Sequence, residues 1–184
     1  GDRAVVHDLH NKDYWYHVFT YPDFHYLSSF GKLGQGPQEI TVGENMRFDS
    51  KGRIFAIDSN KNRLFCFSHI SDSPRFEGST PLDKGLMWAL DFDFYGDNQL
   101  LIPDYTGKKR FCWVSRDGHI LRKMETIPMK DRKKLQESTT AAAQGWRSFV
   151  MFSPSRKELV AVTQLGEVLD IYNLTTGKHY HIVG

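Results

Sequence analysis

The sequence predicts an all-β fold of consecutive small antiparallel sheets, and three observations support this prediction. Short alternating apolar runs fill most of the chain, turn-forming residues separate them, and one kind of run recurs at a nearly constant interval. The recurring runs end at Tyr21, Ser68, Ser115 and Asn173, at intervals of 47, 47 and 58 residues. Four-stranded units that repeat at roughly 40–50 residues are typical of β-propellers, in which each unit is one blade.

Each recurring run follows one or two further strand-like runs. The runs "AVVHD", "IFAID", "LLIPD" and "LVAVT" come before the recurring ones, and "NMRFD", "LDFDF" and "FVMFS" open the last three units. Their turns "SKGR", "YGDNQ" and "PSRKE" contain Gly, Asp, Asn and Pro, which favour tight hairpins. We therefore expect one partial propeller domain over residues 1–184 with about four blades, at approximately 1–31, 44–80, 87–125 and 148–184, the first without its opening strand.

One helix is expected, in the charged stretch "MKDRKKLQES" near residues 129–138. It lies in the connector that lengthens the third interval. The connector is either a solvated loop or a lid that offers cations and an aromatic surface to an anionic or sugar ligand. The lid would use Arg132, Lys133, Lys134, Trp146 and Arg147.

The composition excludes several classes of protein. A formal net charge of +2, from 24 basic and 22 acidic residues without long runs of one sign, provides no large basic face for a nucleic acid. No apolar run approaches the roughly 20 residues that cross a bilayer. Residues 1–20 lack the pattern of an export signal, so we expect a mature or trimmed chain, or one that was never exported. Two cysteines, Cys66 and Cys112, are too few for a disulfide framework.

The up-and-down course of the strands predicts which loops lie together. Connections between blades and turns between second and third strands should lie at one end of the sheets, which we call the rim. The rim loops are "FGKLGQGPQEI", "TPLDKGL", the long connector, "DSNKN", "DYTGKK" and "TQLGE". Propellers commonly bind ligands where such irregular loops converge. The candidate ligand-binding residues are Gln35, Glu39, Asp58, Asn60, Arg63, Asp104, Trp146 and Arg147.

The stretch "GQGPQE" is interpreted as a crossover between the first two blades. Gly34 and Gly36 can adopt positive φ, Pro37 fixes its own φ, and Glu39 can accept hydrogen bonds from exposed amides. A phosphate-binding loop would need a Lys, then Ser or Thr, after the last glycine, followed by a helix. The sequence has neither, so a turn is favoured, with direct ligand contact by Gln35 or Glu39 as the alternative.

An aspartate followed by a short polar turn and a basic residue occurs twice, at Asp58 to Arg63 and, one residue longer, at Asp104 to Arg110. The carboxylate can accept backbone N–H bonds in the turn while the guanidinium reaches back to it. This clamp is the favoured interpretation, and binding of a carbohydrate or peptide is the alternative.

The stretch "FGKLGQGPQEI" followed by "FDSKGRIFAIDSNKNRLFCF" resembles the TolB-like six-bladed β-propeller family. That family has a G-x-G-P-G-E crossover, with Gln38 here in place of the last glycine, and a recurring aspartate with a basic residue. The resemblance implies a six-bladed ring, of which this chain would supply about four blades, and therefore further residues beyond Gly184 or self-association. It also implies an exported protein of the periplasm or outer cell surface, often with a lipid anchor that would lie outside this chain.

No residue pattern predicts a catalytic, metal or cofactor site. Asp91, Asp93 and Gly96 match part of a calcium loop, but Tyr95 and Ile102 occupy ligand positions. The histidines at 7, 10, 17 and 25, and the pair at 179 and 181, provide no set of three or four zinc ligands. There is no G-x-S-x-G elbow.

The function expected from the sequence is a non-enzymatic binding or scaffolding module, exported, with a carbohydrate, peptide or protein ligand. The alternative is a metal-dependent lactonase or lyase, as other six-bladed propellers support, with an axial metal held by residues from several blades.

Overall fold

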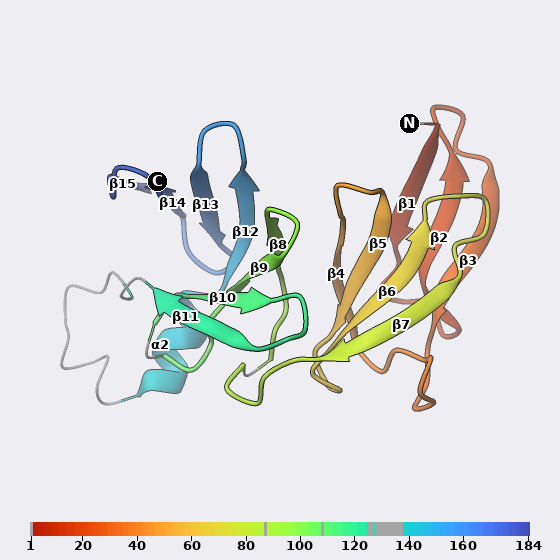
Figure 1. Cartoon of the computed structure of the whole chain (residues 1–184), viewed down its shortest axis with the longest axis horizontal. Coiled ribbons are helices and arrows are strands. Elements are labelled where there is room, and N and C mark those ends of the chain that lie inside the picture. Colours follow the sequence, from red (N-terminus) through yellow and green to blue (C-terminus); the bar gives the residue numbers. More distant parts are fainter. Residues whose placement is uncertain (1, 87, 108, 125–126, 128–137) are drawn as a thin grey trace. The chain divides into compact units, whose positions relative to one another are not determined.

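The computed structural model of the chain describes all residues except 1, 87, 108, 125–126 and 128–137. The described residues form four antiparallel sheets and one short helix (Figure 1). They divide into two compact units, Gly1–Pro81 and Leu82–Gly184, each with two sheets. The all-β architecture of repeated antiparallel blades predicted from the sequence is confirmed.

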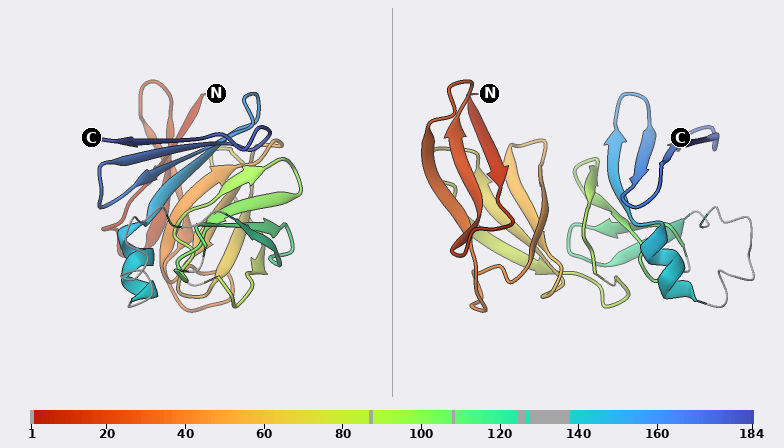
Figure 2. Two further views of the ribbon diagram at one scale, coloured as in Figure 1. Left: turned by 90° about the vertical axis from the view of Figure 1, so that its left-hand side faces the viewer. Right: turned by 180° about the vertical axis from the view of Figure 1, so that it is seen from behind.

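The first unit contains a three-stranded sheet and a four-stranded sheet, in which strands adjacent in sequence are adjacent in space (Figure 2). The missing opening strand of the first sheet agrees with the prediction. The strands are β1 (Arg3–His7), β2 (Tyr14–Thr20) and β3 (Tyr26–Lys32) in the first sheet, and β4 (Gly43–Phe48), β5 (Arg53–Asp58), β6 (Arg63–His69) and β7 (Phe76–Pro81) in the second.

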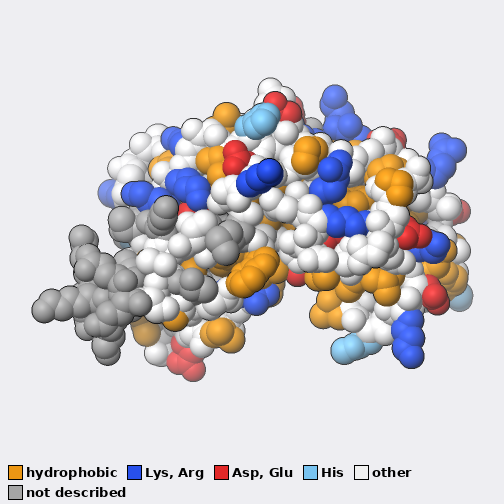
Figure 3. All heavy atoms as spheres, turned by 90° about the horizontal axis from the view of Figure 1, so that it is seen from below, with side chains coloured by type: hydrophobic (Ala, Val, Ile, Leu, Met, Phe, Trp, Pro, Cys, Tyr) orange, Lys and Arg blue, Asp and Glu red, His pale blue; other side chains and the backbone are white. Residues whose placement is uncertain are grey.

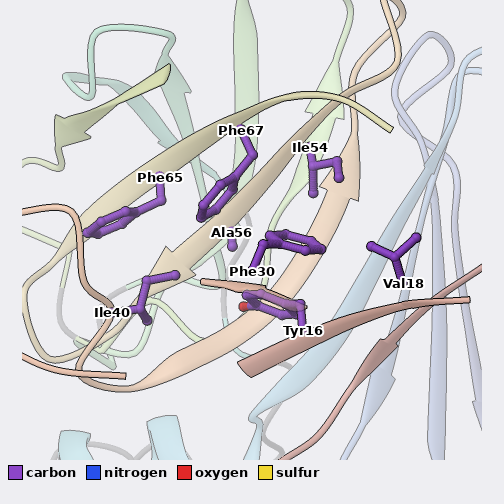
Figure 4. Close-up of a cluster of buried hydrophobic side chains, with 8 residues drawn as sticks. All are labelled: Tyr16, Val18, Phe30, Ile40, Ile54, Ala56, Phe65 and Phe67. Carbon is purple, nitrogen blue, oxygen red and sulfur yellow. The ribbon is translucent and has the colours of Figure 1, made fainter. Parts of the chain in front are cut away.

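The two sheets of the first unit share one apolar core (Figure 4). Alternate residues of a strand point to the same face, so β2, β3, β5 and β6 each contribute side chains to it. Phe30 connects the two sheets, because its ring lies 5.0 Å from that of Phe67 and 5.2 Å from that of Tyr16. The core comprises Tyr16, Val18, Phe30, Ile40, Ile54, Ala56, Phe65 and Phe67.

An aspartate closes the hairpin between β4 and β5. Oδ1 of Asp49 accepts hydrogen bonds from the backbone N–H groups of Lys51 and Arg53, and Oδ2 accepts two from the Arg53 guanidinium at 2.8 and 3.0 Å. Gly52 in this turn has φ +74°, and a Cβ there would lie 2.6 Å from the His69 ring. Burial alone would raise the pKa of Asp49, but the hydrogen bonds from Arg53 outweigh burial and hold that pKa below its ordinary value.

This hairpin should make stability depend on pH in the acid range. Because the folded pKa of Asp49 is depressed, its contribution is present above the unfolded value near pH 4 and is lost as pH falls through the folded pKa. We expect Asp49→Asn to lower the free energy of unfolding by about 1–2 kcal/mol at pH 7, with a smaller difference from wild type at pH 3. Urea denaturation at both pH values measures this, with the exposed Asp23→Asn as control. Equal differences at the two pH values would contradict the assignment.

The second unit contains two four-stranded sheets and the helix. The first sheet has β8 (Asp93–Tyr95), β9 (Gln99–Pro103), β10 (Phe111–Ser115) and β11 (Ile120–Met124), and the second has β12 (Ser148–Ser153), β13 (Glu158–Thr163), β14 (Val168–Asn173) and β15 (His179–Val183). Leu101, Phe111, Trp113, Val150, Leu159, Ala161 and Tyr172 form the core between them.

The helix differs from the prediction. The stretch expected to be helical, 129–138, lies almost entirely outside the described residues. The described helix is α2 (Thr139–Gly145), in a part of the connector for which no helix was predicted. Ser138 caps it by accepting a hydrogen bond from the Ala141 amide, and three consecutive alanines favour the helix.

The expected opening strand "LDFDF" is also different, because only its last two residues, Asp93 and Phe94, belong to β8. Its aspartates instead connect the two sheets of the second unit. Buried Asp91 accepts the amide of Val150, and Asp93 accepts the amide of Phe152, both at 2.7 Å. β12 is an edge strand of its sheet among the described residues, and these carboxylates satisfy two of its amides.

The thiols, the helix and the surface charges of the described residues bear on the expectations from composition. Cys66 and Cys112 are both free thiols, and burial raises the pKa of Cys112 to about 12. None of the described helices is long and apolar enough to cross a membrane. On the face shown in Figure 3, basic and acidic side chains are interspersed with apolar ones, a pattern unlike the continuous basic surfaces that bind phosphate backbones.

Candidate functional site

The crossover between β3 and β4 is held in one conformation by two charged side chains. The Lys61 ammonium donates to three crossover carbonyls, those of Gly34, Gly36 and Glu39, at 3.3, 2.8 and 2.7 Å. Oε2 of Glu39 accepts the amide of Gly36 at 2.9 Å, and Oε1 accepts from the Lys32 ammonium at 2.8 Å. The hydrogen bond from Lys32, followed by the one from the Gly36 amide, lowers the pKa of Glu39. The predicted role of Glu39 as an acceptor of amides is therefore confirmed.

One of the two glycines singled out in the sequence is conformationally required. Gly34 has φ +157°, and a Cβ there would lie 2.1 Å from Oε2 of Glu39. The expectation of positive φ is wrong for Gly36, which lies in an ordinary region. Its amide turns toward Glu39 without a left-handed backbone, because the Glu39 side chain folds back beneath the loop. No helix follows the crossover, which agrees with a turn and not a phosphate loop.

Asp58 connects this crossover to the turn between β5 and β6. The carboxylate is fully buried. It accepts four backbone amides, two from the crossover and two from its own turn: Thr41 at 2.7 Å, Val42 at 3.4 Å, Asn60 at 3.0 Å and Lys61 at 2.9 Å. The carboxylate half of the predicted clamp is therefore present, and two predicted rim loops lie together.

The prediction that the Arg63 guanidinium reaches back to Asp58 is wrong. Arg63 donates to Ser79 on β7, through Nε to Oγ and through Nη2 to the carbonyl, both at 3.1 Å. The oxygens of Asp58 already accept four amides, so the arginine is directed to the neighbouring strand. The second predicted clamp differs in the same way, because Asp104 caps its turn through the amide of Thr106 but pairs with Lys123 at 3.0 Å, not with Arg110.

A pocket of about 540 Å³ lies beside the crossover. We call it the crossover pocket. Gln35 and Arg63, both predicted as ligand-binding residues, line it together. Glu39 lies beneath the loop, Asp58 is buried, and exposed Asn60 does not line it. The lining comprises Gln35, Gly36, Pro37, Gln38, Lys61, Arg63, Phe76, Gly78 and Ser79.

In the second unit the rim loops also lie together, around α2. A Cβ on Gly107 would meet the Thr139 carbonyl at 2.2 Å, so the turn after β9 lies against the start of α2. A mostly apolar pocket of about 460 Å³ lies between α2 and the turn from β13 to β14. Trp146, a predicted ligand-binding residue, lines it with Ser138, Ala141, Ala142, Gly145, Thr163, Gly166 and Val168. The predicted lid cations at 132–134 lie outside the described residues.

Arg110 is the centre of a buried polar cluster that the sequence did not reveal. Its Nη1 lies 2.6 Å from Oδ2 of Asp170 and 2.8 Å from the Tyr172 hydroxyl. The Trp146 ring lies 5.1 Å from the guanidinium carbon, which makes Trp146 a partner of Arg110. Arg147, also a predicted ligand-binding residue, is half-buried and immediately precedes β12.

Two histidines of β15 complete this cluster. Nε2 of His179 and Nδ1 of His181 each lie 2.7 Å from Oδ1 of Asp170. Burial alone would raise the pKa of Asp170, but the hydrogen bonds from His181 and Arg110 outweigh it and lower that pKa. The histidine pair was evident in the sequence, but its acidic partner was not predicted. The signal was available, because antiparallel pairing of "VLDIY" with "HYHIV" places Asp170 opposite His181.

The comparisons with known proteins identify a family and a fold. The model of the TolB-like 6-blade propeller-like family matches residues 1–184. No curated protein matched the sequence.

Three solved structures illustrate the likeness, each at 13% identity or less, which shows the fold alone. A functionally unknown protein from Desulfotomaculum acetoxidans has TM-score 0.60 and 11% identity, over 98% of this chain and 51% of that one. A protein named as exported from Bacteroides fragilis has TM-score 0.59 and 13% identity, over 100% and 69%. Virginiamycin B lyase from Staphylococcus aureus has TM-score 0.53 and 10% identity, over 92% and 48%. The chain thus spans about half the length of two of these structures.

Proposed function

Because the chain belongs to the TolB-like 6-blade propeller-like family, we propose that it is an exported, non-enzymatic binding module whose ligand occupies the crossover pocket. The observation that carries the proposal is the lining of this pocket, which joins two cations, two exposed amides and an aromatic ring on a fixed backbone. The likeness to a protein named as exported supports the location in the periplasm or at the outer surface.

The charges of the crossover pocket favour an anionic ligand. Lys61 and Arg63 line it, and no acidic side chain does. Arg63 presents a planar group whose geometry suits a carboxylate, and Ser79 fixes its orientation. A carboxylate-bearing ligand would therefore find charge complementarity at the crossover pocket.

The remaining lining favours an acidic sugar. The amides of Gln35 and Gln38 are exposed and can exchange hydrogen bonds with hydroxyl groups. Phe76 offers half-buried apolar surface to the face of a sugar ring, and its own position is fixed by contacts with the rings of Phe65 and Phe67. Because Lys61, Asp58 and Glu39 hold the crossover, little backbone freedom remains to be lost on binding, which favours affinity.

Calorimetric titration with trigalacturonate, and with maltotriose as the neutral sugar, tests this proposal. We expect the acidic sugar to bind and Arg63→Gln to weaken binding by about tenfold or more, since a hydrogen bond to a charged group contributes about 1.5–3 kcal/mol. The matched control is Arg75→Gln, an exposed arginine in the turn between β6 and β7 and outside the crossover pocket. Equal binding of both sugars, or an unchanged affinity in Arg63→Gln, would contradict the proposed ligand class.

The alternative function, a metal-dependent lyase or lactonase, is favoured by the polar cluster of Arg110, Asp170 and the two histidines. A carboxylate that orients an imidazole is a common arrangement for general bases. One structural neighbour is a virginiamycin B lyase, at 10% identity. Incubation with virginiamycin B followed by chromatography tests this alternative. We expect no product, and turnover that is lost in His181→Asn would favour the enzyme.

A further inference from the structure

We propose that Asp170, His179 and His181, on the second unit, form a zinc-type metal site that shares no residue with the crossover pocket. Their donor atoms, one from each side chain, all lie within 4.8 Å of one another. Among the described residues this is the one group of three or more histidine, cysteine or acidic side chains with such spacing.

The strand register explains why the three donors converge. His179 and His181 are two residues apart on β15, so both side chains point to the same face. Asp170 on β14 is directly opposite His181, and Tyr172 is opposite His179. The three ligands therefore come from two paired strands, whose backbone hydrogen bonds fix their spacing.

The donor set fits zinc better than magnesium or calcium. Two imidazole nitrogens and one carboxylate oxygen make a three-ligand site with an open fourth position, as in many zinc sites. Magnesium and calcium prefer all-oxygen coordination. The histidine side chains are 33% and 37% exposed, so an ion can enter from solvent and keep a water as its fourth ligand.

The rest of the cluster orients the ligands. Oδ2 of Asp170 is held by Arg110, which leaves Oδ1 directed at both histidines. The His179 ring is stacked on that of Tyr172, with centroids 4.1 Å apart and planes at 10°. Such partners behind the ligands commonly fix ring orientation in metal sites.

A small movement converts the hydrogen-bonded cluster into a coordination site. Tetrahedral zinc with ligand distances of about 2.0–2.2 Å needs donors roughly 3.3–3.6 Å apart, whereas each histidine nitrogen now lies 2.7 Å from Oδ1. The ion takes the place of the protons between these atoms, and each displaced proton either moves to the other nitrogen of its imidazole or is released to solvent. Each histidine then binds the ion as a neutral imidazole with its single proton on the nitrogen that faces away from the ion. β15 is exposed at all five residues and can accommodate this shift. Arg110 repels the ion, which makes the site weaker than a closed structural zinc site.

The test is metal binding by the chain without a histidine tag. We expect calorimetry with zinc chloride to give one ion per chain, cobalt to give the visible bands of tetrahedral coordination, and magnesium and calcium not to bind. His179→Asn and His181→Asn should each weaken zinc binding at least tenfold and abolish the cobalt bands. The control is His25→Asn, an exposed histidine of the first unit, which should bind as wild type does.

Thermal unfolding with and without zinc gives a second measurement of zinc binding to the folded protein. Zinc should raise the melting temperature of the wild type and of His25→Asn, but not of His181→Asn, because binding to the folded state stabilises it. Absence of cobalt bands in the wild type, or zinc affinity unchanged in His181→Asn, would overturn the proposal. Retained trigalacturonate binding in His181→Asn would show that the two proposed sites are independent.

Discussion

Asp58→Ala is expected to lower the free energy of unfolding by about 3 kcal/mol, because buried amides that lose their acceptor cost about 1–3 kcal/mol each and water entering the space offsets part of this. The carboxylate is fully buried and accepts two amides from the crossover and two from its own turn. The loss would therefore release both loops at once. Urea denaturation of the purified variant measures the change.

Two further variants make the Asp58 result specific. Asp58→Asn keeps one acceptor oxygen but places an amide NH₂ against backbone donors, so we expect an intermediate loss. Asp23→Ala removes an exposed carboxylate from the same unit and should change stability by less than about 0.5 kcal/mol. If Asp58→Ala were as stable as Asp23→Ala, the carboxylate would not be the element that holds the crossover.

Arg110→Met is the second substitution with a large expected effect, a loss of about 3–5 kcal/mol in the free energy of unfolding. Removing one partner of a buried ion pair leaves the other charge uncompensated at about this cost. Arg110 is 3% exposed, Asp170 is fully buried, and their charged atoms lie 2.6 Å apart. The two histidines still donate to Asp170, which favours the lower end of this range.

A double-mutant cycle separates the ion pair from the packing of the arginine. Asp170→Asn removes the charge with little change in shape, so the double variant of Arg110→Met and Asp170→Asn should lose less stability than the two single losses added together. Additive losses would indicate that Arg110 acts through its contacts with Trp146 and Tyr172 alone. Chemical denaturation of all four proteins provides the cycle.

The fold could be predicted from the sequence because its determinants are local. The glycine and asparagine turns and the alternation of apolar residues each act within a few residues, and their recurrence at intervals of 47, 47 and 58 residues repeats this local pattern along the chain. The same holds for Asp58, whose turn follows it directly. The prediction that Arg63 pairs with Asp58 was wrong for a nonlocal reason, because Arg63 donates to Ser79 on another strand.

The polar cluster could not be predicted because its members are far apart in the chain. Sixty residues separate Arg110 from Asp170, and no pattern near either residue indicates the other. The contact of Asp91 could not be predicted for the same reason, since its amide partner, Val150, belongs to the next sheet. Only the register between "VLDIY" and "HYHIV" could have been predicted from the sequence, and it would have placed Asp170 beside the two histidines.

Strand β1 forms one edge of the first sheet, and this position affects what the sheet could recognise. Within the described chain β1 pairs with β2 alone, so its other edge carries main-chain donors and acceptors without a strand beside them. An extended segment that paired there would be recognised through its peptide groups, which every sequence possesses. Evolution could therefore change the side chains of such a segment freely and still preserve its attachment, provided that the segment remained extended.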